Sequence, residues 1–329
     1  MNILITGGAG FIGSNLTEYF LTKGYEVTIL DNLSTGHLDN IEQLKSGLSA
    51  ESGGRLEFVK GDTRDLKTCL HCTEGVDYVL HQAALGSVPR SIENPLDSHQ
   101  SNVNGFLNLQ IACRDNNVRR LVFASSSSVY GDHPELPKVE ENIGEVLSPY
   151  ALTKKMNELQ AANFQRVYGL EFVGLRYFNV FGRRQDPEGA YAAVIPRWIM
   201  EFMKGLAPTI NGDGETSRDF CYIDNVIQAN ERAMLTENPD AVNTVYNVAA
   251  GGRTTLNQLY RMLGEELENH LAGFKLPEPV YAPFRPGDIL HSFADISRAG
   301  KLLEYKPSHD IVQGVQESMK WYVENLGQG

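Results

Sequence analysis

Cysteine, tryptophan and positive charge are scarce in this sequence of 329 residues. Four cysteines are too few to form a disulfide framework in a chain of this length, and Cys69 and Cys72 lack the second ligand pair that a zinc site needs. We therefore expect Cys69, Cys72, Cys113 and Cys221 to be small core side chains in a reducing cytoplasm.

The deficit of basic residues and the lack of long apolar runs exclude further classes of protein. Lysine and arginine number 29 against 41 acidic residues, and the formal net charge of −12 disfavours a binder of nucleic acid polymers. No run of about 18 apolar residues occurs, so we expect no membrane-spanning helix. No charged and apolar segment precedes the predicted strand at Asn2, so we expect no secretory signal.

Glycine, by contrast, is abundant, with 31 residues, which predicts tight turns and close approaches of the backbone to a ligand. The length predicts two domains at ~100–200 residues per domain. With 42% hydrophobic and 21% charged residues, the composition is typical of a globular protein.

Short apolar strands alternate with helices through the first half of the chain. The predicted strands are 2–6, 26–30, 56–60, 78–81, 120–124, 171–176 and 246–249, and the predicted helices are 11–23, 65–74, 102–116, 150–168 and 225–235. This alternation predicts an α/β fold with a doubly wound parallel sheet, covered on both faces. Proline and glycine interrupt the pattern after about residue 180, which indicates a smaller mixed α/β domain interleaved with the first.

A glycine-rich turn joins the first predicted strand to the first helix. In Gly7-Gly8-Ala9-Gly10-Phe11-Ile12-Gly13, Gly7 permits the turn, Gly10 lets the backbone approach a pyrophosphate, and Gly13 permits close helix packing. The helix N-terminus then faces the anion. Asp31 ends the second strand, where a carboxylate accepts ribose hydroxyls and repels a 2′-phosphate, so we expect NAD as the cofactor. Asp62 and Thr63 either reach the adenine or cap a loop.

A second constellation combines a tyrosine, a lysine and a run of serines. Tyr150 and Lys154 lie four residues apart, so they share one face of a helix, and we expect the ammonium group to lower the pKa of the phenol. An oxidised nicotinamide would add further positive charge, which makes the tyrosine a usable general base. Ser125 to Ser128 follow the strand 120–124, at the strand end where such sheets bind ligands.

Together these motifs resemble the extended short-chain dehydrogenase/reductases, and among them the nucleotide-sugar 4-epimerases, most of all the UDP-N-acetylglucosamine 4-epimerase group. The resemblance covers essentially the whole chain. It rests on residues 7–13, 31–33, 61–62, 81–84, 102–105, 126–131, 150–154, 176–179 and 285–288. It implies an NAD-binding domain of residues 1–178 plus about 220–250, and a substrate-binding domain of about 179–219 plus 251–329.

The resemblance also implies a role for individual residues. Ser126, Tyr150 and Lys154 would be catalytic. The residues assigned to the cofactor are Gly7, Gly10, Phe11, Ile12, Gly13, Asp31, Asn32, Ser34, Thr35, Gly36, Asp62, Thr63, Gln82, Ala83, Ala84, Asn102, Ser125, Tyr150, Lys154, Tyr177, Phe178 and Val180. Those assigned to a UDP-sugar are Gly86, Ser87, Ser126, Ser127, Ser128, Tyr150, Asn179, Ala193, Val194, Thr209, Asn211, Arg218, Arg285, Asp288 and Ser292. Arg218 and Arg285 resemble a diphosphate clamp.

The residues beside Ser126 favour epimerisation over dehydration. Sugar dehydratases need a carboxylic acid after the catalytic Ser or Thr, whereas Ser127 and Ser128 stand here. Ser292 aligns with a bulky tyrosine of the galactose-type enzymes, and the smaller side chain leaves room for a 2-acetamido group. We therefore expect interconversion of UDP-GlcNAc and UDP-GalNAc, with weaker activity on UDP-Glc and UDP-Gal.

Other functions stay open. The alternatives are a UDP-uronic acid 4-epimerase or decarboxylase, for which Arg90 is the candidate contact, a UDP-glucose 4-epimerase, and a non-enzymatic dinucleotide sensor. His291 is a further candidate substrate contact, whereas we expect His81 to be a core residue. The resemblance also implies a homodimer through a four-helix interface of helices 102–116 and 150–168.

Overall fold

The computed structural model describes residues 1–47, 54–188, 192–284 and 290–326. At its centre is a seven-stranded sheet, in which every adjacent pair of strands is parallel. The strands, in spatial order, are β11 (Thr244–Val248), β6 (Glu171–Tyr177), β5 (Arg120–Ser126), β4 (Tyr78–His81), β1 (Asn2–Thr6), β2 (Glu26–Asp31) and β3 (Arg55–Lys60). The chain runs outward from β1 to β3 and then crosses to β4, so the strand order reverses between β1 and β4. Open sheets of this type bind ligands at such a reversal.

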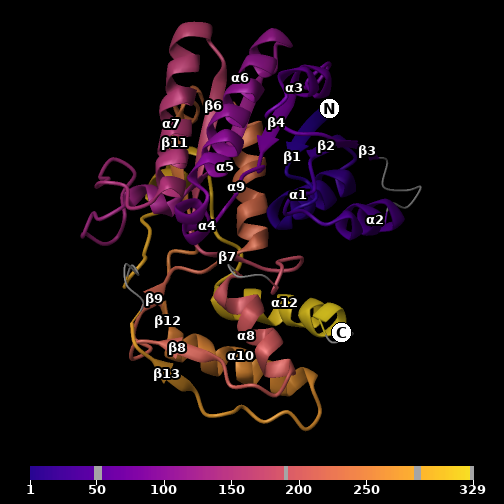
Figure 1. Ribbon diagram of the computed structural model, residues 1–329. Helices are drawn as coiled ribbons and strands as arrows, with labels where there is room; N and C mark the ends of the chain where they lie inside the picture. The colour runs from indigo at the N-terminus through magenta and orange to yellow at the C-terminus, as the bar shows by residue number, and fades with distance from the viewer. Residues whose placement is uncertain (48–53, 189–191, 285–289, 327–329) are drawn as a thin grey trace.

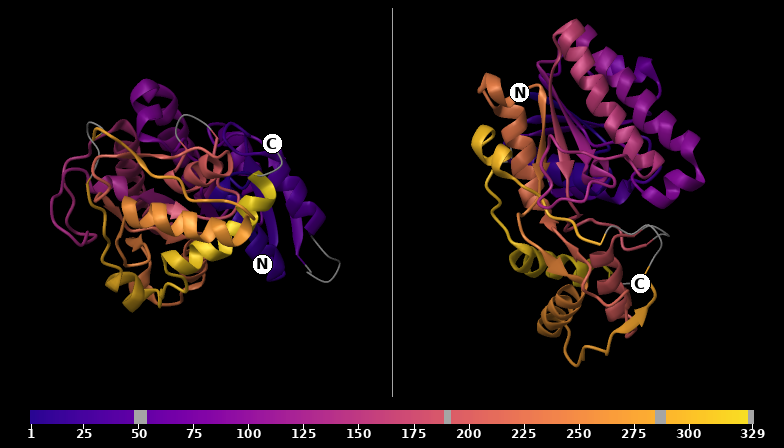
Figure 2. Two further views of the ribbon diagram at one scale, coloured as in Figure 1. Left: turned by 90° about the horizontal axis from the view of Figure 1, so that it is seen from below. Right: turned by 90° about the vertical axis from the view of Figure 1, so that its left-hand side faces the viewer.

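Helices cover both faces of this sheet, because its side chains alternate between two apolar clusters (Figure 2). On one face, residues such as Leu4 and Leu121 pack against α3 (Leu66–Cys72), α6 (Gly105–Asp115) and α7 (Pro149–Tyr168). On the other face, residues such as Ile5 and Val122 pack against α1 (Phe11–Thr22) and α9 (Ile223–Leu235). The short helix α2 (Leu38–Gly47) packs beside β2 through Ile41 and Leu44.

A smaller lobe lies beyond the carboxyl ends of the strands (Figure 1). Its helices are α8 (Val194–Met203), α10 (Leu256–His270) and α12 (Ile311–Leu326). Its short strands pair as β8 (Thr209–Asn211) with β13 (Val280–Ala282), and as β9 (Ser217–Arg218) with β12 (Thr254–Thr255). Between the lobes, β7 (Val180–Phe181) pairs with β10 (Cys221–Tyr222). One apolar cluster runs from the sheet through Trp198 of α8 and Leu263 of α10 to Met319 of α12.

The remaining elements are short. They are α4 (Val88–Glu93), α5 (Pro95–His99), the π-helix η1 (Gln100–Asn104), the 3₁₀ helices η2 (Ser127–Tyr130) and η3 (Pro239–Ala241), and α11 (Ser297–Leu302). The predicted fold class is confirmed. The helix predicted over 102–116 is instead split, because η1 adds a π-turn before α6 begins at Gly105. α11, which the sequence assigned to the second domain, lies against β11 of the sheet.

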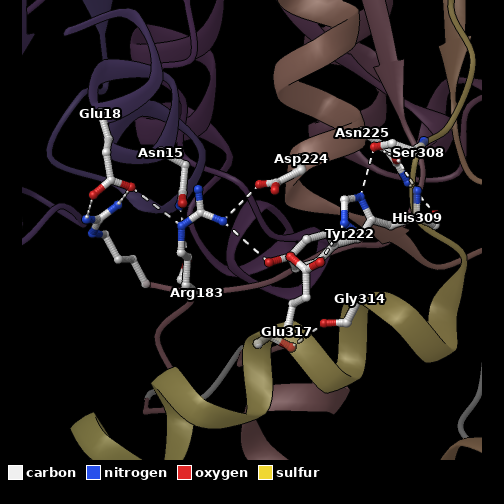
Figure 3. A network of polar contacts seen from close by, with 12 residues as sticks. Asn15, Glu18, Arg183, Tyr222, Asp224, Asn225, Ser308, His309, Gly314 and Glu317 are labelled. Atoms are coloured by element: carbon white, nitrogen blue, oxygen red, sulfur yellow. Dashed lines mark hydrogen bonds and ion pairs between the residues drawn. The ribbon is translucent and has the colours of Figure 1, made fainter. Parts of the chain in front are cut away.

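A polar network ties the two lobes together (Figure 3). Arg183, which follows β7, donates to Asp224 at the start of α9 over 2.8 Å, and its carbonyl accepts from Asn15 of α1 over 3.0 Å. Arg184 binds Glu18 of α1 through two hydrogen bonds of 2.6 and 3.0 Å. These ion pairs fix the chain at the point where it leaves the sheet for the second lobe.

The same network continues to the C-terminal helix. His309 is bonded to Glu317 of α12 over 2.9 Å. Among the described residues, Asp224, His309 and Glu317 bring potential metal-ligand atoms within 4.8 Å of one another. However, Arg183 already forms an ion pair with Asp224, and His309 and Glu317 are hydrogen-bonded to each other, so we interpret the group as an ion-pair network.

In the described part of the chain, no helix is long and apolar enough to cross a membrane.

Candidate active site

A cavity of about 370 Å³ opens at the carboxyl edge of the sheet, where the strand order reverses. The loops after β1, β2, β3 and β4 form its walls. Its lining residues are Gly7, Gly10, Phe11, Ile12, Gly13, Leu30, Asp31, Asn32, Ser34, Thr35, Gly61, Asp62, Thr63, Gln82, Ala83, Ala84, Leu85, Gly86 and Ser101. Most of the residues that the sequence assigned to the cofactor therefore line one cavity.

The glycines of the first turn differ in what they make room for. Gly7 has a φ of +71°, and a Cβ there would lie 2.7 Å from the backbone nitrogen of Ala83. A Cβ at Gly13 would lie 2.2 Å from the carbonyl oxygen of Gly7, so this glycine permits contact between turn and helix. At Gly10, a Cβ would meet the Gly7 oxygen at 3.3 Å and would project into the cavity that Gly10 lines. The turn thus leaves space for an anionic group at the N-terminus of α1.

Asp31, the last residue of β2, lines the cavity. Its Oδ2 accepts a hydrogen bond from the backbone N–H of Ala9 over 3.0 Å, and its Oδ1 accepts one from Leu33 over 2.8 Å. A carboxylate offers about four acceptor sites, so it can accept these two bonds and still bind ribose hydroxyls in the cavity. The residue therefore both caps its own loop and fits the predicted role.

Asp62 caps a loop, the second of the two roles that the sequence left open, and it also lies in the cavity wall. Its Oδ1 accepts from the backbone N–H of Arg64 over 2.8 Å, as a loop cap does. The Arg64 guanidinium and the Asn32 amide also donate to it, and despite the opposing effect of burial they lower the pKa of Asp62 to about 2. The carboxylate is therefore ionised near neutral pH.

Ser126, Tyr150 and Lys154 come together beside the end of β5. Ser148 caps the N-terminus of α7, because its Oγ accepts from the N–H of Ala151 over 3.1 Å, and this places Tyr150 in the first helical turn. Tyr150 lies close enough to Ser126, the last residue of β5, for the serine to influence its pKa. The Lys154 Nζ lies 6.0 Å from the centre of the Tyr150 ring and donates to the carbonyl of Ala124 over 2.8 Å.

The electrostatics of this group differ from the sequence expectation. Burial raises the pKa of the Tyr150 phenol, and the nearby Ser126 side chain opposes this effect. Burial also lowers the pKa of the Lys154 ammonium to about 8. We expected the lysine and an oxidised nicotinamide to lower the pKa of this phenol; in the protein without the cofactor, desolvation instead raises it.

Several residues assigned to the cofactor are enclosed by protein instead. Asn102 is fully buried, and it donates to Thr153 Oγ1 over 3.1 Å and exchanges hydrogen bonds with the backbone of Leu85. Phe178 is also fully buried, in a small apolar cluster, and Ser125 donates to Glu158 over 2.6 Å. Asn102 and Phe178, for which we predicted contacts with a cofactor, therefore expose no atom in this structure. Asn102 is bonded to Leu85 of the cavity wall, whereas Phe178 packs among residues that do not line the cavity.

The predicted substrate residues lie around the space between the lobes. Ser128 donates to the Oγ of Ser126 over 3.0 Å, and Ser127 begins η2. Ser87 caps α4, and Asn179 donates to the carbonyl of Asp219. Ala193 and Val194 begin α8, and Thr209 and Asn211 lie on β8. Arg285 and Asp288 lie outside the described residues.

Arg218 and Ser292 lie on one ribbon. Arg218, on β9, donates to the carbonyl of Leu290 over 3.1 Å, and Ser292 donates its N–H to the carbonyl of Ser217 over 3.0 Å. His291, a candidate substrate contact in the sequence, hydrogen-bonds with the hydroxyl of Ser217 over 2.9 Å. The structure thus places Arg218 and Ser292 beside each other.

Sequence reasoning missed four residues that line the cavity, namely Leu30, Gly61, Leu85 and Ser101. The first three adjoin predicted residues, so extending each motif by one position finds them. Ser101 belongs to the π-helix, which the apolar pattern does not reveal. The sequence also missed Asp219. Its buried carboxylate accepts hydrogen bonds from the backbone N–H groups of Ala250 and Ala294, and burial raises its pKa to about 6.

Comparison with known proteins agrees with this site. The model of the NAD dependent epimerase/dehydratase family matches residues 3–249. A putative UDP-glucose 4-epimerase of Methanocaldococcus jannaschii is 36% identical over 326 residues, which cover 98% of this chain and 99% of the relative. A UDP-glucuronate 4-epimerase of Thermodesulfobacterium geofontis is 32% identical over 328 residues, which cover 98% of this chain and 96% of the relative.

A solved structure is similar over nearly the whole chain. It is the UDP-N-acetylglucosamine 4-epimerase from Methanobrevibacter ruminantium M1 in complex with UDP-N-acetylmuramic acid, with 40% identity, a TM-score of 0.88 and coverage of 98% of both chains. The cavity, its glycine-rich turn and the group of half-buried Ser126 and Tyr150 with buried Lys154 agree with this comparison. The chain therefore belongs to the NAD-dependent epimerase/dehydratase family of extended short-chain dehydrogenase/reductases, and it is an NAD-dependent enzyme of the nucleotide-sugar 4-epimerase group.

Proposed function

We propose that this enzyme interconverts UDP-GlcNAc and UDP-GalNAc, by inversion at carbon 4 through a 4-keto intermediate, and acts more weakly on UDP-Glc and UDP-Gal. The observation that carries the reaction type is the convergence of Ser126, Tyr150 and Lys154, with the hydroxyls of Ser127 and Ser128 as neighbours. Dehydration would need a proton donor for the leaving hydroxyl, and a serine hydroxyl is too weak an acid for that task.

In this proposal, Tyr150 moves the proton of the 4-hydroxyl. Its phenolic oxygen takes that proton when the keto group forms and returns it when the alcohol reforms. Ser126 would hydrogen-bond with the same oxygen and with Tyr150, so it would align the two. Lys154 favours the phenolate by its positive charge, which the carbonyl of Ala124 helps to hold in place.

The cavity residues would hold NAD. The glycine-rich turn and the N-terminus of α1 would bind its diphosphate, and Asp31 would accept hydrogen bonds from ribose hydroxyls. When bound, NAD supplies the hydride acceptor and donor, and its oxidised ring adds positive charge that favours the Tyr150 phenolate. Because the protein alone raises the pKa of this phenol, we expect the base to form when the oxidised cofactor is bound.

The choice of sugar rests on small residues. Ser292 lies beside Arg218 on the ribbon where a UDP-sugar would extend its diphosphate, and its short side chain leaves room for a 2-acetamido group. Gly86 lines the cavity, and an added Cβ there would meet no heavy atom of the described residues within 4 Å. The similar enzyme from Methanobrevibacter ruminantium, which binds a 2-acetamido sugar nucleotide, supports this preference.

Turnover on five UDP-sugars tests the proposal. The purified enzyme is incubated with UDP-GlcNAc, UDP-GalNAc, UDP-Glc, UDP-Gal and UDP-glucuronic acid, and the products are separated by chromatography. We expect the acetylated pair to have the highest kcat/KM. Higher kcat/KM on the glucose pair or on the uronic acid would overturn the assignment. Ser292→Tyr should lower kcat/KM for the acetylated pair about tenfold or more and spare the glucose pair.

We also propose that two copies of the chain associate through α6 and α7. The outward face of α7 carries Leu152, Leu159 and Val167, which are 47%, 59% and 58% exposed, and their spacing places them on one stripe of the helix. Pairing two such stripes about a two-fold axis would bury them in a four-helix interface.

We also propose a cytoplasmic location, because all four cysteines are free thiols.

A further inference from the structure

Three side chains form a closed ring of hydrogen bonds behind the cofactor cavity. The hydroxyl of Tyr177 donates to Oε1 of Gln82 over 3.1 Å, and Nε2 of Gln82 donates to Oδ1 of Asn230 over 3.2 Å. Nδ2 of Asn230 closes the ring by donating to the Tyr177 hydroxyl over 2.8 Å. Each residue both donates and accepts, so the ring fixes the orientation of both amide groups.

The ring joins parts of the fold that are distant in the sequence. Gln82 directly follows β4, Tyr177 ends β6, and Asn230 lies in the middle of α9. Asn230 is fully buried, and its Nδ2 also donates to the carbonyl of Val226 over 2.8 Å. Burying a side-chain amide costs folding free energy unless its N–H and C=O groups form hydrogen bonds. We therefore look for the role of Asn230 in the residues to which it is hydrogen-bonded.

One of those partners lines the cavity. Gln82 and the two alanines after it form a wall of the cavity and cross over the glycine-rich turn. There, a Cβ on Gly7 would lie only 2.7 Å from the nitrogen of Ala83. The backbone of Gln82 and Ala83 therefore lies directly against the turn, and Gln82 links the ring to this wall of the cavity.

We propose that Asn230 is a positioning residue for the dinucleotide and acts through Gln82. A carboxamide nitrogen carries two N–H groups, and Asn230 accepts one of those on Gln82. The second is left to donate to an oxygen of a dinucleotide, because Gln82 lines the cavity and the ring fixes its amide group. Asn230 itself is enclosed and touches no cofactor. The inference rests on the use of NAD in the proposed function and does not depend on the sugar.

The test compares Asn230→Leu with Asn225→Leu. Both residues are fully buried asparagines of α9, but the hydrogen-bond partners of Asn225 are Ser308 and His309, which are not part of the ring (Figure 3). The measurement is the rate at which the purified holoenzyme releases bound NAD, trapped by a second dehydrogenase, together with the melting temperature. We expect Asn230→Leu to release NAD at least fivefold faster than Asn225→Leu at a similar loss of melting temperature.

Two further variants separate positioning from general destabilisation. Tyr177→Phe opens the same ring from the sheet side and should also speed release, which keeps the test usable if Asn230→Leu does not fold. In a Gln82→Leu background, Asn230→Leu should add little to the release rate. The proposal would be overturned if Asn230→Leu and Asn225→Leu released NAD at the same rate. It would also be overturned if the double variant increased the release rate by the product of the two single effects of Gln82→Leu and Asn230→Leu. Normal NAD release with no turnover of UDP-GlcNAc would instead contradict the proposed function.

Discussion

At the residue scale, the catalytic group is costly to fold. Lys154 is buried with its charge facing a single carbonyl, and burial lowers its pKa from 10.5 to about 8. Between these two values the unfolded chain binds the proton more strongly than the folded one, so stability rises with pH across that window. Below pH 8 the folded protein carries the full cost of a buried ammonium. Such a cost is common where catalysis needs a charge that the fold disfavours.

Replacing this lysine should therefore stabilise the protein while it abolishes turnover. Lys154→Met removes the charge but keeps the length, and we expect a gain of at most about 3 kcal/mol in the free energy of unfolding at pH 7. The gain should shrink as the pH rises from 8 to 10. Urea unfolding across this range measures it, with Lys155→Met on the same helix as the control. A gain that is constant with pH would contradict the burial argument.

The cysteines should behave as inert core residues. Burial raises the pKa of Cys69 to about 12 and that of Cys72 to about 11, and all four thiols are buried. A thiolate is the reactive form, so we expect no labelling of the native protein by a disulfide reagent at pH 8 within minutes. After denaturation four thiols should react. Rapid labelling of the native protein would show that one of them is exposed.

At the scale of elements, two glycines of the glycine-rich turn have different roles: one permits the fold, and the other leaves space for the cofactor. The structure predicts different outcomes for two single-methyl changes in the same turn. Gly13→Ala places a Cβ 2.2 Å from the Gly7 oxygen, so the contact between turn and helix must open and the melting temperature should fall. Gly10→Ala brings its Cβ to 3.3 Å from the Gly7 oxygen, a contact that a shift of a few tenths of an ångström relieves, and adds a methyl group to a residue that lines the cavity.

Gly10→Ala should therefore fold normally and bind NAD at least tenfold more weakly. Calorimetry with NAD and thermal unfolding without it distinguish the two variants, and Gly47→Ala, which meets no described heavy atom within 4 Å, is the matched control. If Gly10→Ala bound NAD as tightly as the wild type, the turn would not hold the diphosphate.

The elements also show how far the sequence predicts the structure. The strands of the main sheet and α7 are predicted well, because each has a continuous or periodic apolar pattern. The two-residue strands β7, β9, β10 and β12 are missed, because they are too short to show any period. Asp31, Tyr150 and Lys154 are found by spacing. The role proposed for Asn230 and the raised pKa of Tyr150 cannot be predicted in this way, because both depend on which distant residues surround the side chain in the folded protein.

At the scale of the whole molecule, the exposed stripe of α7 predicts the oligomeric state. The double variant Leu152→Glu/Leu159→Glu places two charges in the proposed four-helix interface and should convert a dimer to a monomer. Light scattering coupled to size-exclusion chromatography measures this. Leu206→Glu is the control, because Leu206 is similarly exposed, at 55%, but lies on the second lobe after α8. A wild-type chain that elutes as a monomer would contradict the proposal.

The position of β11 in the sheet has a consequence for synthesis. This edge strand pairs with β6, yet it lies after residues of the second lobe in the chain, and α9, which covers one face of the sheet, also comes late. A ribosome-bound chain that ends after β6 therefore exposes an open sheet edge and an uncovered apolar face. The nascent enzyme must keep this surface from aggregating until about seventy further residues have emerged. Neither lobe is therefore formed by one continuous segment of the chain.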